Sequence, residues 1–444
     1  MCSKLKHLYQ KKSLHFLLFL WGLLFMTLLF FPGQSFGVIY IDINAPSDRK
    51  FNTAIPDFIN QSIHNEHPEM SSGLPAVIKN DLDLSGYFKP MDKSAFLVEK
   101  SASATGKIRF KDWSVIGAEL LLKGKYTCIG NSLEVEIRLY DVFWGRQILG
   151  KRAIGSINDP GGLMHRLGNE IIRTLTGQDG IFCTKLAFVG NASGSKEIYV
   201  CDYDGHNVQP LTADKSIALL PKWSPNGKKI IYTSYKEGGP MLFLKDMASG
   251  VLKRISARSG LNIGSSWTPD GNKVALTLSQ KGNPDIFIID LNGKIVKNII
   301  HHWGIDVSPV FSPNGKKIAF VSNMSGSPQI HVYDLDRETE ERLTFKGNYN
   351  TSPVWSRLNR LAFVSTNNGQ SDICAMDPDG SNLIMLTENQ GNNEDPCWSP
   401  DGRYIVFSSN RAGNYHLYIM NANGQNQRRI TFLKGDQTSP SWSW

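Results

Sequence analysis

One segment of the sequence has the spacing of a hydrolase nucleophile. Gly33-Gln-Ser-Phe-Gly37 matches the Gly-x-Ser-x-Gly motif, in which a serine on a sharp strand-to-helix turn attacks a carbonyl carbon. Here the motif follows an apolar segment, with no strand before it and no helix after it, so we interpret the match as coincidence. An α/β-hydrolase domain would also need about 250 residues, and the repeats described below occupy most of the chain. The sequence therefore predicts no catalytic residue.

Paired carboxylates suggest a second kind of chemistry, the binding of calcium. Asp202 and Asp204, and again Asp377 and Asp379, lie in Asp-x-Asp-Gly sequences. A calcium loop would need further oxygen ligands at close spacing, and neither sequence provides them. We interpret both pairs as turn-forming residues.

Histidines and isolated acids give two further candidates for metal binding. His301 and His302 are adjacent, and adjacent side chains of an extended segment point apart, so we expect a solvated loop rather than a metal site. Four acids precede the inner strands of a repeated unit and form a candidate weak calcium site at a channel mouth: Asp306, Glu394, Asp395 and Asp436. Apart from this candidate we expect no cofactor and no metal.

The elements that would position these residues come from an internal repeat. An aromatic residue, then Ser or Thr, Pro, Asp or Asn, and Gly recurs at spacings of 44, 44, 44, 43 and 44 residues, with an altered fourth copy and a shortened last copy. An apolar strand follows each of the first five copies, and a second alternating strand follows that one. The copies begin at Trp223, Trp267, Phe311, Trp355, Trp398 and Trp442.

The repeated motif suits a tight hairpin between two short strands. Proline sets φ at the first corner, Asp or Asn tolerates the second, and Gly takes a positive φ. The aromatic residue before them is suited to filling the space between neighbouring sheets. A four-stranded sheet of this size cannot bury both faces alone, so the units must stack, and this repeat length is typical of a propeller blade. In the altered copy we expect Asn359 to take the positive φ.

The two ends of the repeat complete one another. Residues 185–189 lie 44 residues before 229–233, so the first unit begins at its second strand and lacks an inner strand. The last copy, at Trp442, is an inner strand with nothing after it. The sequence thus predicts that residues 181–444 form a closed six-bladed β-propeller whose first and last strands share one blade, which removes exposed sheet edges.

The first 37 residues have the pattern of an export signal. Basic residues up to Lys12 precede an apolar run, and Ser35-Phe36-Gly37 places small residues at a cleavage site. The alternative is an uncleaved anchor, since the run is nearly long enough to span a membrane. We expect residues 1–37 to be a signal peptide and residues 38–177 to form a small α/β domain. Within it the patterns predict helices at 72–85, where Pro75 limits the start, and 160–176, and strands at 119–126, 133–140 and 146–153.

Charge and cysteine usage argue against other classes. The 444-residue chain has a formal net charge of +8, of which four come from lysines in the first 37 residues. The rest is spread out, with no Lys/Arg run of the kind that binds nucleic acid. Five cysteines remain after Cys2, an odd number without metal-ligand spacing, so we expect buried, small apolar side chains and no disulfide framework.

The loops that lead into the inner strands are polar and unlike one another. In a propeller such loops converge around one mouth of the central channel. A rigid scaffold that presents variable loops is typical of a recognition surface. The loops are residues 260–264, 303–307, 347–351, 391–395 and 435–438.

Taken together, these features resemble the TolB family, the periplasmic propeller proteins of the Tol–Pal system. The resemblance rests on the export signal, the α/β domain, the sequence Leu-Thr-Gly-x-x-Gly-Ile at 175–181 and the Trp-Ser-Pro-Asp-Gly blades, and it covers nearly the whole chain after the signal. It implies a non-enzymatic protein in the periplasm of a Gram-negative bacterium. Such a protein links the peptidoglycan-associated lipoprotein Pal to inner-membrane TolA, for outer-membrane integrity and cell division.

The resemblance also implies two binding sites. A TolA-like protein would bind the N-terminal segment Val38, Ile39, Tyr40, Ile41, Asp42 and Ile43. If Pal binding favours a state with this segment tucked between the domains, TolA binding must oppose it by the same coupling energy. Family members often carry a histidine where this chain has Leu261. A Pal-like lipoprotein would bind at the channel mouth, where the candidates are Leu261, Asn262, Gly264, Asp306, Val307, Ser308, Tyr349, Asn350, Thr351, Glu394, Asp395 and Thr438.

Two other functions stay open from the sequence alone. A periplasmic propeller hydrolase or lyase acting on glycans or peptides would need catalytic groups that converge in the channel. A structural propeller that depends on a cation would need a set of oxygen ligands there.

Overall fold

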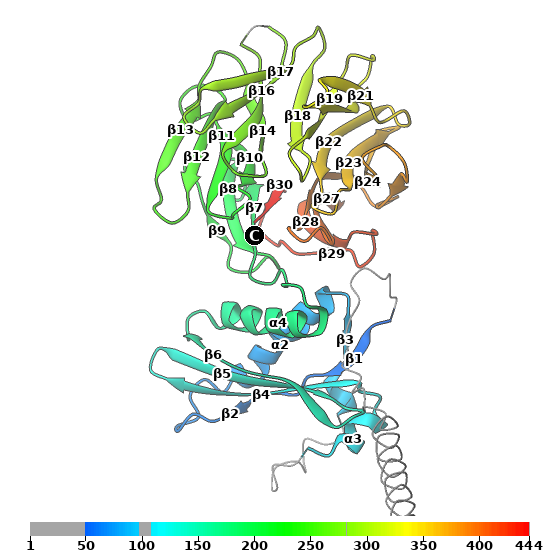
Figure 1. The fold of residues 1–444 in the computed structure, drawn as a ribbon. Helices are drawn as coiled ribbons and strands as arrows, with labels where there is room; N and C mark the ends of the chain where they lie inside the picture. Colours follow the sequence, from blue (N-terminus) through cyan, green and yellow to red (C-terminus); the bar gives the residue numbers. More distant parts are fainter. Residues whose placement is uncertain (1–48, 97–107, 281, 444) are drawn as a thin grey trace, which may run out of the picture. The chain divides into compact units, whose positions relative to one another are not determined.

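The computed structural model describes residues 49–96, 108–280 and 282–443 of the chain. It contains a mixed α/β region and, after it, six four-stranded sheets (Figure 1). The predicted signal peptide and the segment 38–43 lie outside the described residues. Within those residues, no helix has the length and apolar character needed to cross a membrane.

The α/β region is built on one mixed sheet. Its strands follow the order β3-β1-β4-β5-β6, with β2 paired to β4. Strands β4, β5 and β6 are antiparallel, whereas β1 and β2 run parallel to β4. The long strands confirm the three predicted strands of this region. The bounds are β1 Phe51–Ala54, β2 Ile59–Asn60, β3 Phe88–Pro90, β4 Leu120–Ile129, β5 Ser132–Asp141 and β6 Arg146–Ser156.

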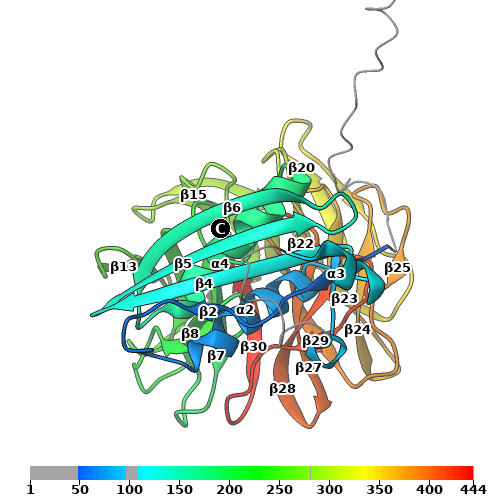
Figure 2. The same cartoon turned by 90° about the horizontal axis from the view of Figure 1, so that it is seen from below.

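Two helices, α2 (Met70–Leu84) and α4 (Pro160–Thr176), pack against each other on one face of this sheet (Figures 1 and 2). The predicted helix at 160–176 is confirmed. Asp159 caps it by accepting a 2.9 Å hydrogen bond from the Gly162 N–H, and Gly177 ends it at φ +71°. Two shorter elements lie between β3 and β4 in the sequence: η1 (Lys93–Ala95) follows β3, and α3 (Phe110–Val115) precedes β4.

The start of α2 differs from the prediction. We expected Pro75 to limit where this helix begins, but the helix starts at Met70 and contains Pro75. A proline cannot donate to the carbonyl four residues earlier, which here belongs to Ser71. That carbonyl instead accepts a 2.8 Å hydrogen bond from the Phe58 N–H. The helix therefore tolerates the proline because a neighbouring segment supplies the missing donor.

The six sheets follow the predicted repeat, and we number the blades 1 to 6 from β10 onward. The inner strands are β10 Ala218–Trp223, β14 Asn262–Trp267, β18 Asp306–Phe311, β22 Tyr349–Trp355, β26 Asn393–Trp398 and β30 Gln437–Trp442. The second strands are β11 Lys229–Ser234, β15 Lys273–Leu278, β19 Lys317–Ser322, β23 Leu361–Asn367, β27 Tyr404–Ala412 and β7 Lys185–Gly190. The third strands are β12 Met241–Asp246, β16 Asp285–Asp290, β20 Gln329–Asp334, β24 Gln370–Met376, β28 Asn414–Asn421 and β8 Glu197–Asp202. The outer strands are β13 Leu252–Ser256, β17 Ile295–Ile300, β21 Thr339–Arg342, β25 Ile384–Met385, β29 Arg428–Arg429 and β9 Gln209–Pro210.

The repeated aromatic residues pack between neighbouring blades, as predicted. Trp267 of blade 2 lies in one apolar cluster with Ile231 and Leu242 of blade 1. Trp398 of blade 5 has the same relation to Val364 and Ile373 of blade 4. The main apolar core of the propeller is therefore the stack of interfaces between sheets.

Blade 6 joins the two ends of the propeller chain. Strand β30 pairs antiparallel with β7, with Trp442 opposite Leu186 and Thr438 opposite Val189. The Trp442 indole donates a 2.7 Å hydrogen bond to the Thr184 hydroxyl. The prediction that the last residues supply the missing inner strand is confirmed.

Candidate functional site

Every inner strand is irregular at the same point. Pairing with the second strand shifts register there in all six blades, which marks a β-bulge. In five of the six, a proline follows the bulged residue, and proline cannot donate to a ladder. The bulged residues have φ between +50° and +60° and are Leu220, Gly264, Ser308, Ser352, Asp395 and Ser439.

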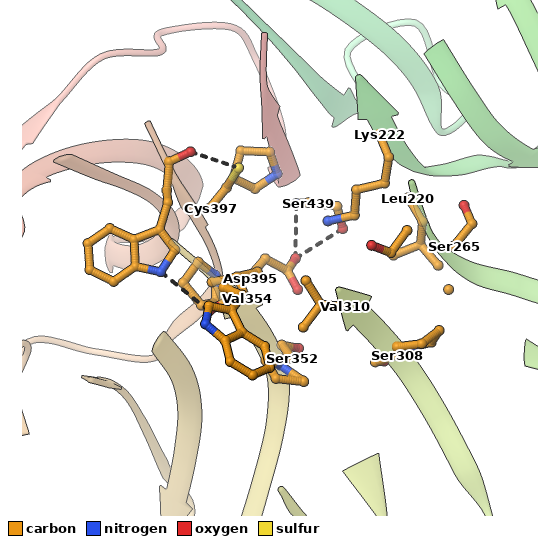
Figure 3. Close-up of a pocket in the computed structure, with 18 residues that line it drawn as sticks. Leu220, Lys222, Ser265, Ser308, Val310, Ser352, Val354, Asp395, Cys397 and Ser439 are labelled. Carbon is orange, nitrogen blue, oxygen red and sulfur yellow. Dashed lines mark hydrogen bonds between the residues drawn. The ribbon is translucent and has the colours of Figure 1, made fainter. Parts of the chain in front are cut away.

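The bulges surround a cavity in the central channel. The cavity has a volume of about 230 Å³ and is lined by all six inner strands (Figure 3). Its wall is mostly small or apolar, with Ser265, Val310 and Cys397 among its side chains. Lys222 and Asp395 are the two charged residues among those that line it.

Hydrogen bonds fix the Asp395 carboxylate within this cavity. Its Oδ2 accepts one bond of 2.9 Å from the Ser439 N–H and one of 3.0 Å from the Ser439 hydroxyl (Figure 3). Burial raises the pKa of the Cys397 thiol, which keeps it protonated and unreactive. The cavity is therefore a small binding site with a mostly small or apolar wall, and its thiol is not an activated nucleophile.

The other end of the channel has an aromatic wall. A second cavity, of about 290 Å³, is lined by tryptophans of the repeated motif together with Arg357. Each tryptophan is the last residue of its inner strand, and Arg357 lies in the turn that follows β22. The tryptophans are Trp223, Trp267, Trp355, Trp398 and Trp442.

Three of the residues predicted to contact a partner are completely buried. The side chains of Asn262, Asp306 and Asn350 have no exposed surface. Asn350 donates a 2.8 Å hydrogen bond to Gln329 in the preceding blade and one of 2.9 Å to the Lys346 carbonyl. Asn262 donates a 2.7 Å bond to the Arg258 carbonyl. The two amides hold the mouth loops in place from beneath.

The other predicted mouth residues divide into three groups. Gly264, Ser308 and Asp395 are bulge residues that line the channel cavity. Tyr349 is half exposed at the start of β22. The remaining side chains, partly buried on the loops and inner strands, are Leu261, Val307, Thr351, Glu394 and Thr438.

The four acids that formed the candidate calcium site lie in different local environments. Asp395 is held by Ser439, and the Asp436 Oδ1 accepts a 3.0 Å bond from the Tyr415 N–H. Burial, with the nearby charge of Asp395, raises the pKa of Glu394. The fourth acid, Asp306, is buried beneath the mouth. The four residues do not converge on one point, and the presence of calcium here stays a prediction.

Our sequence analysis missed a set of exposed apolar side chains in the loops that lead into the inner strands. Trp303, Phe345 and Phe432 are 69, 73 and 74% exposed. An arginine lies over each phenylalanine ring, Arg342 at 4.8 Å and Arg429 at 4.7 Å. The sequence carries a signal for two of them, the repeated motif Arg-Leu/Ile-Thr-Phe at residues 342–345 and 429–432. Ile217, Ile305 and Tyr349 extend the set, which we call the mouth apolar set; of its members, Tyr349 was already a predicted partner contact.

The cysteines agree only in part with the prediction. Cys128, Cys201 and Cys374 are buried and Cys397 is partly buried, but Cys183 is exposed. All five are free thiols. Cys183 follows α4 in the segment that leads into the first strand of the propeller, which leaves it at the surface.

Comparison with known proteins identifies the family. The family model for the TolB beta propeller domain matches residues 172–444, and the model for the TolB amino-terminal domain matches residues 39–148. The chain belongs to the TolB family. The first of these matches alone covers more than half of the chain, and the resemblance drawn from the sequence is confirmed.

Individual TolB proteins are similar to this chain over shorter lengths. The Tol-Pal system protein TolB of Desulfosudis oleivorans is 38% identical over 209 residues, 46% of this chain and 47% of the relative. The protein of the same name from Syntrophus aciditrophicus is 35% identical over 234 residues, 51% of each chain. The matches thus span about half the length of these curated relatives. The crystal structure of TolB from Acinetobacter baumannii has a TM-score of 0.78 and 27% identity, and covers 89% of this chain and 98% of that one.

Proposed function

We propose that this TolB-family chain is a non-enzymatic, protein-binding component of the Tol–Pal system in the envelope of a Gram-negative bacterium. The matched relatives named as Tol-Pal system proteins support this assignment. The predicted signal peptide would export the chain to the periplasm, where it would contribute to outer-membrane integrity and cell division.

The observation that carries the proposal is the mouth apolar set. Aromatic side chains that are exposed on a rigid scaffold are the usual anchors of protein interfaces. Here the guanidinium groups of Arg342 and Arg429 pack over the rings of Phe345 and Phe432 and restrict their side-chain motion. Buried amides such as Asn350 fix the loops that carry these rings. A surface prepared in this way loses little entropy on binding. The partner that we propose for it is the soluble domain of a Pal-like lipoprotein.

The channel cavity favours a protein partner over a glycan. Its volume of about 230 Å³ is below the range of roughly 300–1,000 Å³ usual for small-molecule sites. A cavity of this size accommodates one or two side chains of a protein docked on the mouth. Its pair of charges, Lys222 and Asp395, could orient a polar side chain that enters it.

A second partner, TolA-like, is proposed for the segment 38–43. This part of the proposal rests on the family resemblance, since the segment lies outside the described residues. The linkage between the two sites then requires that each partner weaken the other by the same factor.

Binding of a purified Pal-like domain tests the proposal. Replacing Trp303, Phe345 or Phe432 by Ala should weaken its affinity by about 10-fold or more each, because an exposed aromatic anchor is lost. The matched control is Phe143→Ala, which removes an aromatic that is 80% exposed in the α/β region. Deleting residues 38–46 should abolish TolA binding and preserve Pal binding. Three mouth variants that bind as the wild type does, or turnover of a glycan or peptide, would contradict the proposal.

A further inference from the structure

The Asp395 carboxylate shows how one bulge of the channel can satisfy the next. Asp395 is the bulged residue of blade 5, and Ser439 is the bulged residue of blade 6, its neighbour in the ring. A single carboxylate oxygen accepts hydrogen bonds from the N–H of Ser439 at 2.9 Å and from its hydroxyl at 3.0 Å (Figure 3). Two donors that converge on one charged oxygen make a charge-assisted contact, which is stronger than a bond between neutral groups.

Blades 2 and 3 repeat the donors of this contact but lack its acceptor. Their bulged residues are Gly264 and Ser308, so the serine is kept and the residue before it in the ring has no side chain. A Cβ added to Gly264 would lie 3.5 Å from the Ser308 nitrogen, which is ordinary van der Waals contact. The ladder between β18 and β19 is interrupted at this serine. Ser308 is therefore related to Gly264 as Ser439 is to Asp395.

A second donor beside Gly264 is unsatisfied. Thr277 lies on β15 opposite Ile263, and its side chain is completely buried. Within the described residues, its Oγ1 has no hydrogen-bond partner, and this oxygen lies 3.6 Å from the same Cβ position on Gly264. In blade 1 the equivalent hydroxyl, that of Thr233, donates a 3.0 Å bond to the Asn262 carbonyl. A buried hydroxyl without a partner is rare in folded proteins, and it indicates that an acceptor binds at this position.

Lys222 brings a positive charge to the cavity that the bulges surround. It lies on β10 of blade 1, between blades 6 and 2 of the ring, and it is the one basic residue among the described residues that line the channel cavity. The Asp395 carboxylate is engaged by Ser439, and within the described part of the chain Lys222 forms no ion pair. Ser308 lies across the cavity from Asp395 (Figure 3). Because the wall is mostly small or apolar, the field of the ammonium group is weakly screened and attracts an anion. The equivalent residues of the other blades carry no charge and are Ser266, Val310, Val354, Cys397 and Ser441.

We propose that Gly264 and Ser308 form a carboxylate-binding site in the channel cavity. A bound carboxylate would accept hydrogen bonds from the N–H and the hydroxyl of Ser308, in the space beside Gly264 that a longer side chain would fill. The contact would repeat, on the opposite side of the ring, the one that blades 5 and 6 make. The Thr277 hydroxyl would gain an acceptor, and the Lys222 ammonium would offset the negative charge.

Two sources of such a carboxylate fit the cavity. One is a small organic acid of a few heavy atoms, which a cavity of about 230 Å³ can hold. The other is an aspartate or glutamate side chain of a protein docked on the mouth. This second source rests on the proposed function, whereas the first does not. In both cases the same donors recognise the carboxylate, so one variant of the site tests them together.

Replacing Gly264 by Asp would fill the site from within. Gly264 has φ +60°, and Asp395 adopts φ +50° at the equivalent bulge, so an aspartate is compatible with this backbone. The added Cβ would lie 3.5 Å or more from its neighbours, so the variant should fold. Its carboxylate should bind Ser308 as the Asp395 carboxylate binds Ser439, and a crystal structure of Gly264→Asp would show this contact.

Saturation-transfer NMR with sodium acetate measures binding to the intact protein, with sodium chloride added to hold the ionic strength constant. We expect saturable acetate binding to the wild type and none to Gly264→Asp. Lys222→Ser, which introduces the residue found in blades 2 and 6, should weaken acetate binding by about 10-fold, because a charged partner is lost. Lys273→Ser, which removes an exposed lysine outside the cavity, should bind acetate as the wild type does.

Binding of a purified Pal-like domain then distinguishes the two sources. If the docked protein supplies the carboxylate, Gly264→Asp binds the domain more weakly and acetate competes with the domain for the wild type; if a small acid supplies it, neither effect occurs. Acetate binding without any binding of the domain would support the site and reject the proposed function. The site is overturned if the wild type binds no acetate, or if Gly264→Asp, shown to be folded by circular dichroism, binds acetate as the wild type does.

Discussion

At the scale of single residues, His165 is held between two carboxylates. It lies on α4, with Asp81 of α2 at Nδ1 and Asp204, which follows β8, at Nε2. Tyr203 donates to Asp81 from the same propeller turn as Asp204. Burial alone would lower the pKa of His165, but the hydrogen bond and charge of Asp81, with the charge of Asp204, raise it above its usual value. Burial also raises the pKa of Asp81.

The raised pKa values of His165 and Asp81 predict how the stability of the protein depends on pH. A histidine whose pKa is higher in the folded state stabilises fully below its unfolded pKa of about 6.5, and that contribution is lost as pH rises through the folded pKa. The raised pKa of Asp81 also makes the free energy of unfolding fall as pH rises. We therefore expect the difference in unfolding free energy between the wild type and His165→Gln to be larger at pH 6 than at pH 8.5. Urea unfolding measures it, with exposed His64→Gln as the control, and a difference that grows with pH would contradict the prediction.

At the scale of elements, the altered turn in blade 4 shows how one residue replaces a motif. The turn lacks the usual Pro and Gly, and Asn359 takes the left-handed conformation at φ +59°. Its side-chain oxygen accepts a 3.1 Å bond from the Trp355 indole. Asn359→Ala should cost about 1–2 kcal/mol, because a Cβ without a polar group is strained at this φ. Asn359→Gly should cost less, since glycine adopts this φ freely. Chemical denaturation measures both, and an Ala variant as stable as the wild type would refute this account.

That turn also shows what the sequence could and could not provide. Asn359, the hairpins and the shared blade were predictable because turn chemistry and a fixed repeat depend on local residues. The bulges were missed, although proline after Ser308 or Asp395 is their sequence signal. The burial of Asp306 was not predictable, because which face of a short strand end is covered depends on the neighbouring blade. The exposure of Phe345 was not predictable either, because an apolar residue that follows a strand is usually buried in a core.

At the scale of the whole molecule, the propeller depends on β30, the last strand in the sequence. Strand β30 provides the inner edge of blade 6 and contacts the inner strands β26 and β10 on either side. It also buries Trp442, whose indole reaches Thr184 at the other end of the propeller chain. Without β30, β7 would become an exposed edge and two blade interfaces would lose their innermost contacts.

Removing residues 438–444 should therefore loosen more than one blade. Loss of a buried tryptophan alone costs about 3–5 kcal/mol, and losing the strand adds its ladder hydrogen bonds with β7. We expect the midpoint of thermal unfolding to fall by about 10 °C or more. Trp442→Phe, which keeps the strand, should have a much smaller effect, and a synthetic peptide of residues 437–444 should restore part of the stability when added to the truncated protein. A truncated chain that melts with the intact one would mean that the ring does not depend on its last strand, and the rigid mouth argued from that ring would lose its physical basis.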